Sequence, residues 1–171
     1  MTTVDSATAQ RPVRWRDTWR FPVLLFLFEL AVLLVVVQTS HDHLSFEHPQ
    51  TAPDISDAAF YGGWMQLDTG WYVYLAEHGY DQHQVDEFKA GNTSAVAYFP
   101  AYPLTVRQVA RLTADDFVLA AELTTVVCGL GVTLLFWAWC GRRLTARARR
   151  SSLLLYALYP YAWFLFGTGY G

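Results

Sequence analysis

The chain has 171 residues, of which 53% are hydrophobic and 16% aromatic, and its formal net charge is −3. Only 16% of the residues are Lys, Arg, Asp or Glu, against about 25% in an average soluble domain. This balance excludes a typical soluble domain and a strongly basic nucleic-acid-binding protein, and it favours an integral membrane protein.

Three apolar segments approach the length that a bilayer core requires, which is about 20 residues with a range of about 17–25. Residues 21–38 contain one acid, Glu29, and residues 117–140 contain Glu122 near their start. The third segment, 152–171, reaches the required length only by including the small residues at its end. The sequence therefore predicts an all-α integral membrane protein with three transmembrane helices.

Arginines indicate how the chain is oriented. Four lie in the tail 1–20, and five lie in the segment 141–151, which contains no acid. Because basic segments next to a span stay in the cytoplasm, we expect a multi-pass protein of the cell membrane with a cytoplasmic N-terminus and a long extracytoplasmic loop, 39–116. The arginines of 141–151 also fit a nucleic-acid patch. Their place between two spans favours contact with anionic lipid headgroups instead, so we expect no nucleic-acid partner.

The outer loop carries two predicted interfacial helices. The first ends at Gly79, and it has one face of residues at three- and four-residue spacings: Trp64, Asp68, Trp71, Tyr72 and Leu75. Since Trp and Tyr concentrate at membrane interfaces, this face indicates an amphipathic helix on the membrane surface. Residues 81–93 are expected to form a polar loop and 95–99 a short extended segment. Pro103 then suits the first turn of a second helix, running to about Leu112.

Asp68 lies within the aromatic face of the first helix and not on its wet side. A carboxylate placed toward an apolar surface must be paired, protonated or used. Two interpretations stay open: a functional acid, or an acid that caps a helix or pairs with Arg107 or Arg111. These two arginines share a helix face and could bind a phosphate. Headgroup contact is the favoured role for Arg111, and that of Arg107 stays open.

The histidines do not favour a metal site. His41, His43 and His48 are close in the sequence, and His83 lies further along the outer loop. A zinc site needs three or four rigidly held ligands, and these positions lack the helical spacing that would hold them. We therefore expect no bound metal.

Four segments resemble the N-terminal portion of the PIG-V-type mannosyltransferases, the family of glycosylphosphatidylinositol mannosyltransferase 2 and its bacterial homologues. In the outer loop they are LDTGWY at 67–72, LAEHGY at 75–80 and YFPAYPL at 98–104. In the third apolar segment, LYPYAWF at 158–164 resembles the Pro-aromatic segment of that family. The similarity covers most of 57–171, in the order and topology of the family.

The resemblance implies that the chain is the front part of a GT-C glycosyltransferase, a multispan membrane enzyme. That family uses a polyprenyl-phosphate sugar as donor and no cofactor, and it has an essential acid in the first outer loop. At the matching position here stands Asp68, which would be the base of an inverting transfer of mannose or another hexose at the outer membrane face. The substrate-binding residues that we then expect are Trp71, Tyr72, Tyr98, Tyr102 and Arg107.

The chain differs from the family in length. GT-C enzymes are much longer, so we expect this chain to be a fragment that is too short to be active alone. The expected partners are the lipid-linked sugar donor, an acceptor glycan, glycolipid or protein, and the membrane. The alternative is a non-catalytic three-span membrane protein that binds lipid-linked sugar or a partner subunit.

Overall fold

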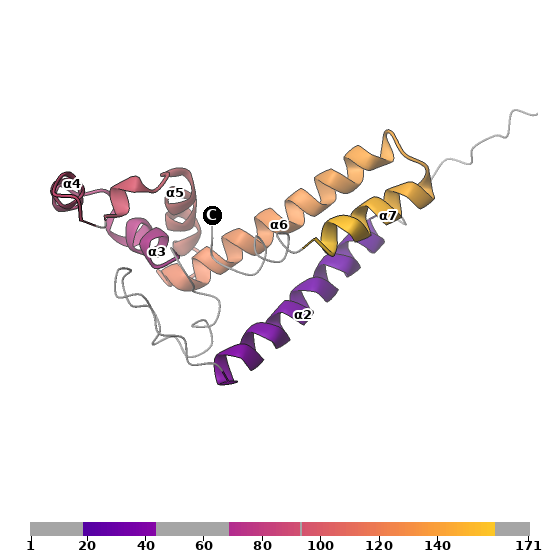
Figure 1. Ribbon diagram of the computed structural model, residues 1–171, viewed down its shortest axis with the longest axis horizontal. Coiled ribbons are helices and arrows are strands. Elements are labelled where there is room, and N and C mark those ends of the chain that lie inside the picture. Colours follow the sequence, from indigo (N-terminus) through magenta and orange to yellow (C-terminus); the bar gives the residue numbers. More distant parts are fainter. Residues whose placement is uncertain (1–18, 44–68, 93, 160–171) are drawn as a thin grey trace, which may run out of the picture.

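The computed structural model describes residues 19–43, 69–92 and 94–159, and every regular element in these ranges is a helix. The prediction of an all-α chain is therefore confirmed for this part of the protein. Figure 1 shows two groups of helices that share α6. The long group consists of α2 (Arg20–His43), α6 (Phe117–Gly141) and α7 (Ala146–Ala157). The short group, at one end of α6, consists of α3 (Thr69–His78), α4 (Gln82–Lys89), the 3₁₀ helix η1 (Ala95–Ala97) and α5 (Ala101–Ala110).

Helices α2 and α6 are long and apolar enough to cross a membrane. The apolar stretch of α2 is Arg20–Thr39, 20 residues that include an 18-residue segment with a mean hydropathy of 2.5. That of α6 is Phe117–Gly141, 25 residues that include such a segment with a mean hydropathy of 2.0. Both agree closely with the expected segments 21–38 and 117–140. The helix of α2 continues to His43, so the first residues of the expected outer loop, 39–43, are helical.

The connection between α6 and α7 is much shorter than the expected basic loop 141–151. Helix α7 begins at Ala146, and the side chain of Thr145 caps it by accepting a hydrogen bond from the backbone N–H of Ala148. A helix forms here because Ala and Arg both favour helices. The third transmembrane helix, 152–171, stays a prediction, because α7 ends at Ala157 and residues 160–171 lie outside the described part.

The prediction of a polar loop over 81–93 is wrong, because the structure forms α4 there. Within α4, the side-chain Nε2 of Gln82 donates to Oδ1 of Asp86 at 3.0 Å, and Nζ of Lys89 lies 3.7 Å from the same oxygen. Side-chain pairs three and four residues apart stabilise a helix without any apolar periodicity. Its two apolar residues, Val85 and Phe88, are too few for the sequence pattern to predict a helix.

The extended segment expected over 95–99 is also wrong at its start. Ser94 caps η1 by accepting from the backbone N–H of Val96 at 3.3 Å, and Tyr98, which follows η1, has extended backbone angles. Helix α5 then begins at Ala101, with Pro103 in its first turn as expected. It ends at Ala110, two residues before the expected position.

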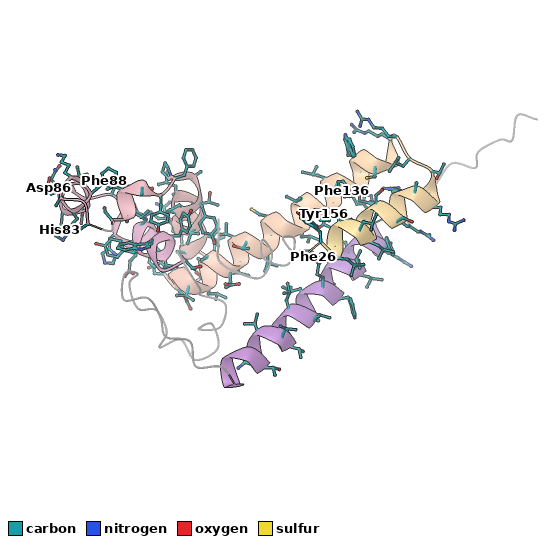
Figure 2. All side chains as sticks on the ribbon, viewed as in Figure 1. Phe26, His83, Asp86, Phe88, Phe136 and Tyr156 are labelled. Atoms are coloured by element: carbon teal, nitrogen blue, oxygen red, sulfur yellow. The ribbon has the colours of Figure 1, made fainter. Side chains whose placement is uncertain are left out.

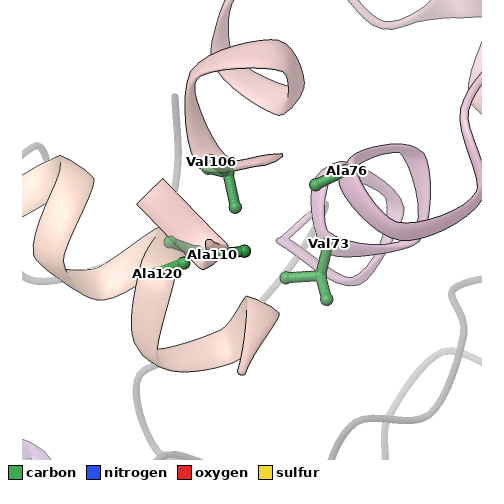
Figure 3. Close-up of a cluster of buried hydrophobic side chains, with 6 residues drawn as sticks. Val73, Ala76, Val106, Ala110 and Ala120 are labelled. Carbon is green, nitrogen blue, oxygen red and sulfur yellow. The ribbon is translucent and has the colours of Figure 1, made fainter. Parts of the chain in front are cut away.

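Small side chains allow α3, α5 and α6 to pack closely (Figure 3). Their shared core consists of residues that are at most 4% exposed: Val73, Ala76, Val106, Ala110, Ala120 and Ala121. In the long group, Phe26 is buried and Tyr156 packs against its cluster, while the rings of Phe136 and Tyr156 are 5.1 Å apart (Figure 2). These two cores fix both ends of α6 to neighbouring helices.

A tight turn joins α5 to α6. Ala114 and Asp115 have positive φ angles of 53° and 63°. Asp116 then caps α6, because its Oδ1 accepts from the backbone N–H of Leu119 at 2.9 Å. The short group is therefore attached directly to the end of the second apolar helix.

Candidate functional site

Four of the five expected substrate-binding residues meet in one aromatic cluster, formed by Trp71, Tyr72, Tyr98 and Tyr102. Tyr72 is central: its ring centroid lies 5.1 Å from that of Tyr98 and 5.3 Å from that of Tyr102, both edge to face. Trp71 stacks on Tyr98 with centroids 6.3 Å apart and planes 20° apart. Trp71 is buried, and the three tyrosines are half-buried. The cluster therefore joins α3, η1 and α5 and still presents ring surface.

Hydrogen bonds hold the tyrosines of the aromatic cluster in place. The hydroxyl of Tyr102 donates to the backbone carbonyl of Ala121 at 3.1 Å and shares a hydrogen bond of 2.9 Å with Oγ1 of Thr125. Burial raises the pKa of Tyr102 to about 12, so its phenol stays protonated at neutral pH. The hydroxyl of Tyr80 donates to the backbone carbonyl of Tyr98 at 2.7 Å. The cluster is thus tied to α6 on one side and to the end of α3 on the other.

Arg107 lies at the carboxyl end of α3 and bonds three of its backbone carbonyls. Nε donates to Ala76 O at 2.6 Å, and Nη2 donates to Leu75 O at 3.3 Å and to Glu77 O at 3.4 Å. A cation is favourable at this end of a helix, where carbonyls without helical partners collect. Gly79, with φ +81°, ends α3 as expected, and a Cβ there would lie 3.3 Å from Nη2 of Arg107. The sequence did not anticipate this structural role.

The expected catalytic acid, Asp68, lies outside the described residues. In the sequence it directly precedes Thr69, with which α3 begins. Thr69 and Gly70 are both buried, so the first turn of α3 is packed inside the short group. The assignment of Asp68 as a base, and its alternative as a helix cap, both stay predictions.

An acid in the first turns of α6 lies near the aromatic cluster. Glu122 is close enough to Tyr102 that its charge contributes to raising the phenol's pKa. Its Oε1 is buried and has no hydrogen-bond partner among the described residues. From the sequence we expected an acid at this end of the second span, bordering the outer loop, but not its proximity to Tyr102. That proximity depends on how α5 packs against α6.

The remaining expected residues do not join this cluster. Arg111 is exposed at the end of α5. Within the described ranges, no group of three or more His, Cys, Asp or Glu residues lies close enough together to hold a metal ion. His48 lies outside these ranges.

Comparisons with known proteins returned no relative: no family model, no curated protein and no solved structure matches this chain. The resemblance to PIG-V-type mannosyltransferases therefore depends on the residues of the four segments alone.

Proposed function

We propose that this chain is the front part of a membrane-embedded GT-C-type glycosyltransferase. It would transfer mannose or another hexose from a polyprenyl phosphate to an acceptor hydroxyl at the outer membrane face. The observation that carries the proposal is the aromatic cluster. Two segments of the family-like signature, 67–72 and 98–104, contribute its four rings, although they are distant in the sequence.

The exposed surface of the two long helices supports a membrane location. Large apolar side chains lie on the outside of α2, including Leu24, Phe28 and Val35, which are 64%, 67% and 64% exposed. On α6, Val127 and Leu135 are 66% and 72% exposed. A soluble helix buries its apolar residues and presents polar ones to water. Continuous exposed apolar faces are instead typical of helices that contact lipid.

The proposed reaction uses the acid and the rings in separate roles. The carboxylate of Asp68 takes the proton of the acceptor hydroxyl, whose oxygen forms a bond to the anomeric carbon of the sugar. The bond between that carbon and the phosphate oxygen breaks, and the polyprenyl phosphate leaves with the electron pair. Attack opposite the leaving group inverts the anomeric centre. Tyrosine and tryptophan rings can stack on the apolar face of the sugar, which orients it.

Arg107 has little capacity left to bind the leaving phosphate. Arg107 already donates to three carbonyls through Nε and Nη2, which leaves Nη1 as its nitrogen without a described hydrogen bond. This observation favours a second candidate function, a non-catalytic membrane protein that binds lipid-linked sugar or a partner subunit. Such a protein would use the aromatic cluster but need no cation on a leaving phosphate.

The test of the proposed reaction is Asp68→Asn in the complete protein, assayed with polyprenyl-phosphate mannose and a glycolipid acceptor. The amide keeps the shape and hydrogen bonding of the side chain but cannot accept the proton. We expect transfer to fall about 10²–10⁴-fold, with expression and insertion unchanged. Asp115→Asn is the matched control, because Asp115 is exposed and Asn tolerates its left-handed backbone.

Three results are distinguishable in this assay. Near-normal turnover of Asp68→Asn would refute the base assignment. Loss of expression would support the helix-capping role. Binding of the lipid-linked sugar with no transfer by the unmodified complete protein would favour the non-catalytic candidate.

The membrane orientation has its own test, which uses labelling of single cysteines in intact cells. Cys128 and Cys140 are first replaced by alanine, and Asp86→Cys or Thr145→Cys is then added, both at exposed positions. An impermeant thiol reagent is expected to label position 86 and not position 145. The reverse pattern would overturn the proposed orientation.

A further inference from the structure

Among the described residues, one end of the long helix group carries cations and no acid. The end is formed by the turn between α6 and α7 and by the first turn of α2, whose Phe21 lies 5.5 Å from Trp137, centroid to centroid. Its arginines are Arg20, Arg142, Arg143, Arg147, Arg149 and Arg150. The sequence contains no Asp or Glu after Glu122. Within the described part, both ion pairs lie on α3 and α4, so none of these arginines is neutralised there by an acid.

One of the six arginines has a structural role. Nε of Arg149 donates to the backbone carbonyl of Trp137 at 2.9 Å, and its guanidinium carbon lies 3.6 Å from the centroid of the Trp137 ring. A Cβ at Gly141 would lie only 2.8 Å from the same carbon, so the glycine makes room for the guanidinium. Arg149 therefore holds α7 against α6 and is not free to bind a ligand.

The other five arginines are exposed, and one of them lies over an exposed aromatic ring. Arg143 lies over the Trp139 ring at 4.9 Å, and Trp139 is 51% exposed. One helical turn from Trp139 along α6 is Leu135, 72% exposed, and five residues beyond the last arginine of α7 is Leu155, also 72% exposed. A cation over an exposed Trp ring, near exposed apolar side chains, is typical of protein segments that lie at a membrane interface.

We propose that Arg20, Arg142, Arg143, Arg147 and Arg150 form a binding site for the phosphates of anionic phospholipids, with Trp139 at the level of the headgroups. This site, the cationic end, is separate from the aromatic cluster and does not depend on glycosyl transfer. It does depend on the proposed membrane location.

Charge and geometry together favour a lipid over other phosphates. Guanidinium groups bind phosphate with charge-assisted, often bidentate hydrogen bonds. A nucleic acid or free phosphate would match the charge but would leave the adjacent leucines uncovered. A phospholipid matches both parts, because its phosphate meets the arginines where its acyl chains meet Leu135 and Leu155.

The test measures which lipids stay with the purified 171-residue chain. The protein is reconstituted at low salt into vesicles of phosphatidylcholine and phosphatidylglycerol in a 7:3 ratio, gently extracted and analysed for bound lipid. We expect phosphatidylglycerol to be enriched several-fold over its share in the vesicles. The enrichment should weaken as salt is raised, because exposed charges are screened.

Substitution of the turn and α7 arginines should remove the enrichment. Each cation near an anionic surface raises affinity about fivefold, so the variant Arg142→Gln, Arg143→Gln, Arg147→Gln and Arg150→Gln should bind both lipids in the vesicle ratio. The same positions changed to Lys should keep part of the enrichment, which also shows that loss in the Gln variant is not misfolding. Lys89→Gln, which removes an exposed cation at the other end of the molecule, is the control and should behave like the unchanged chain.

Four outcomes would overturn the proposal: no enrichment by the unchanged chain, retained enrichment by the Gln variant, displacement of the lipid by a short RNA, or displacement by inorganic phosphate. Failure of the chain to resist carbonate extraction from vesicles would overturn it together with the membrane location. Enrichment by a chain whose complete protein performs no sugar transfer would uphold the lipid site and remove only the proposed function.

Discussion

Replacing Arg107 by alanine is expected to destabilise the short helix group. The guanidinium donates to three carbonyls at the end of α3, but the bonds are unequal. The contact from Nε to Ala76 O, at 2.6 Å, is short, whereas both Nη2 contacts are close to the outer limit for a hydrogen bond. We therefore count one charge-assisted bond and one favourable contact with the helix terminus.

The expected magnitude follows from these two contributions. A hydrogen bond from a charged group contributes about 1.5–3 kcal/mol, and a cation at a helix carboxyl end adds about 0.3–1 kcal/mol. Because Arg107 is half-buried, solvent screens part of the second contribution. The net loss in the free energy of unfolding for Arg107→Ala is then about 2 kcal/mol. In a chain of this length that lowers the melting temperature by about 4–8 °C.

The assay is the apparent melting temperature of the detergent-purified chain, followed by tryptophan fluorescence. Arg107→Lys should lie between the unchanged protein and Arg107→Ala, because an ammonium keeps the charge but not the fork of donors. Arg111→Ala is the control, since this exposed residue should change the free energy of unfolding by less than about 0.5 kcal/mol. Equal melting temperatures for Arg107→Ala and Arg111→Ala would refute the capping role, and Arg107 would again be a candidate to bind the leaving phosphate.

Three further predictions concern stability in the same assay. Gly79→Ala should lower the free energy of unfolding by about 1–2 kcal/mol, because Gly79 has a positive φ. The loss should be larger than for Gly91→Ala, because of these two glycines only Gly79 would place the new Cβ against Arg107. Equal losses for the two variants would exclude that contact. Folding raises the pKa of Tyr102 from 10.0 to about 12, so the protonated phenol stabilises the fold fully below pH 10, and this contribution is lost as the pH rises toward 12. Tyr102→Phe should therefore flatten the dependence of the free energy of unfolding on pH between 10 and 12. An unchanged slope would contradict the burial of this phenol. Asp116→Ala should lower the free energy of unfolding by about 1 kcal/mol, because α6 loses its cap. Asp116→Asn should be nearly neutral, because Asn caps helices as well as Asp does. Similar losses in both variants would indicate that the negative charge of Asp116 also contributes.

The parts of the fold that the sequence predicted are those with a local cause. The bounds of α6 follow from the length of one apolar run, and the end of α3 follows from Gly79. Helix α4 was missed because it is short and has only two apolar residues, Val85 and Phe88, among polar ones such as Gln82 and Asp86. The short α6–α7 turn was missed because arginines were interpreted as loop residues, although they also favour helices.

The sequence predicted which residues belong to the candidate site, but not how they contact one another. The signature segments named the four rings of the aromatic cluster, and the structure brings these rings together. The capping role of Arg107 was not predictable, because it joins residues that are 31 positions apart in the sequence. The proximity of Glu122 to Tyr102 likewise depends on the packing of α5 against α6. The role of Asp68 stays a prediction.

The contact between Arg107 and the end of α3 also constrains the order of folding. Helix α3 has only ten residues, which is too short for a stable isolated helix in water. The carbonyls at its carboxyl end accept hydrogen bonds from Arg107 of α5, which the ribosome synthesises about thirty residues later. During synthesis α3 therefore becomes stable only after α5 has been made, whereas α2 has the full apolar length of a span as soon as it is synthesised. The aromatic cluster is thus a late product of folding, and variants that slow the docking of α5 should prolong the exposure of its rings to chaperones and proteases.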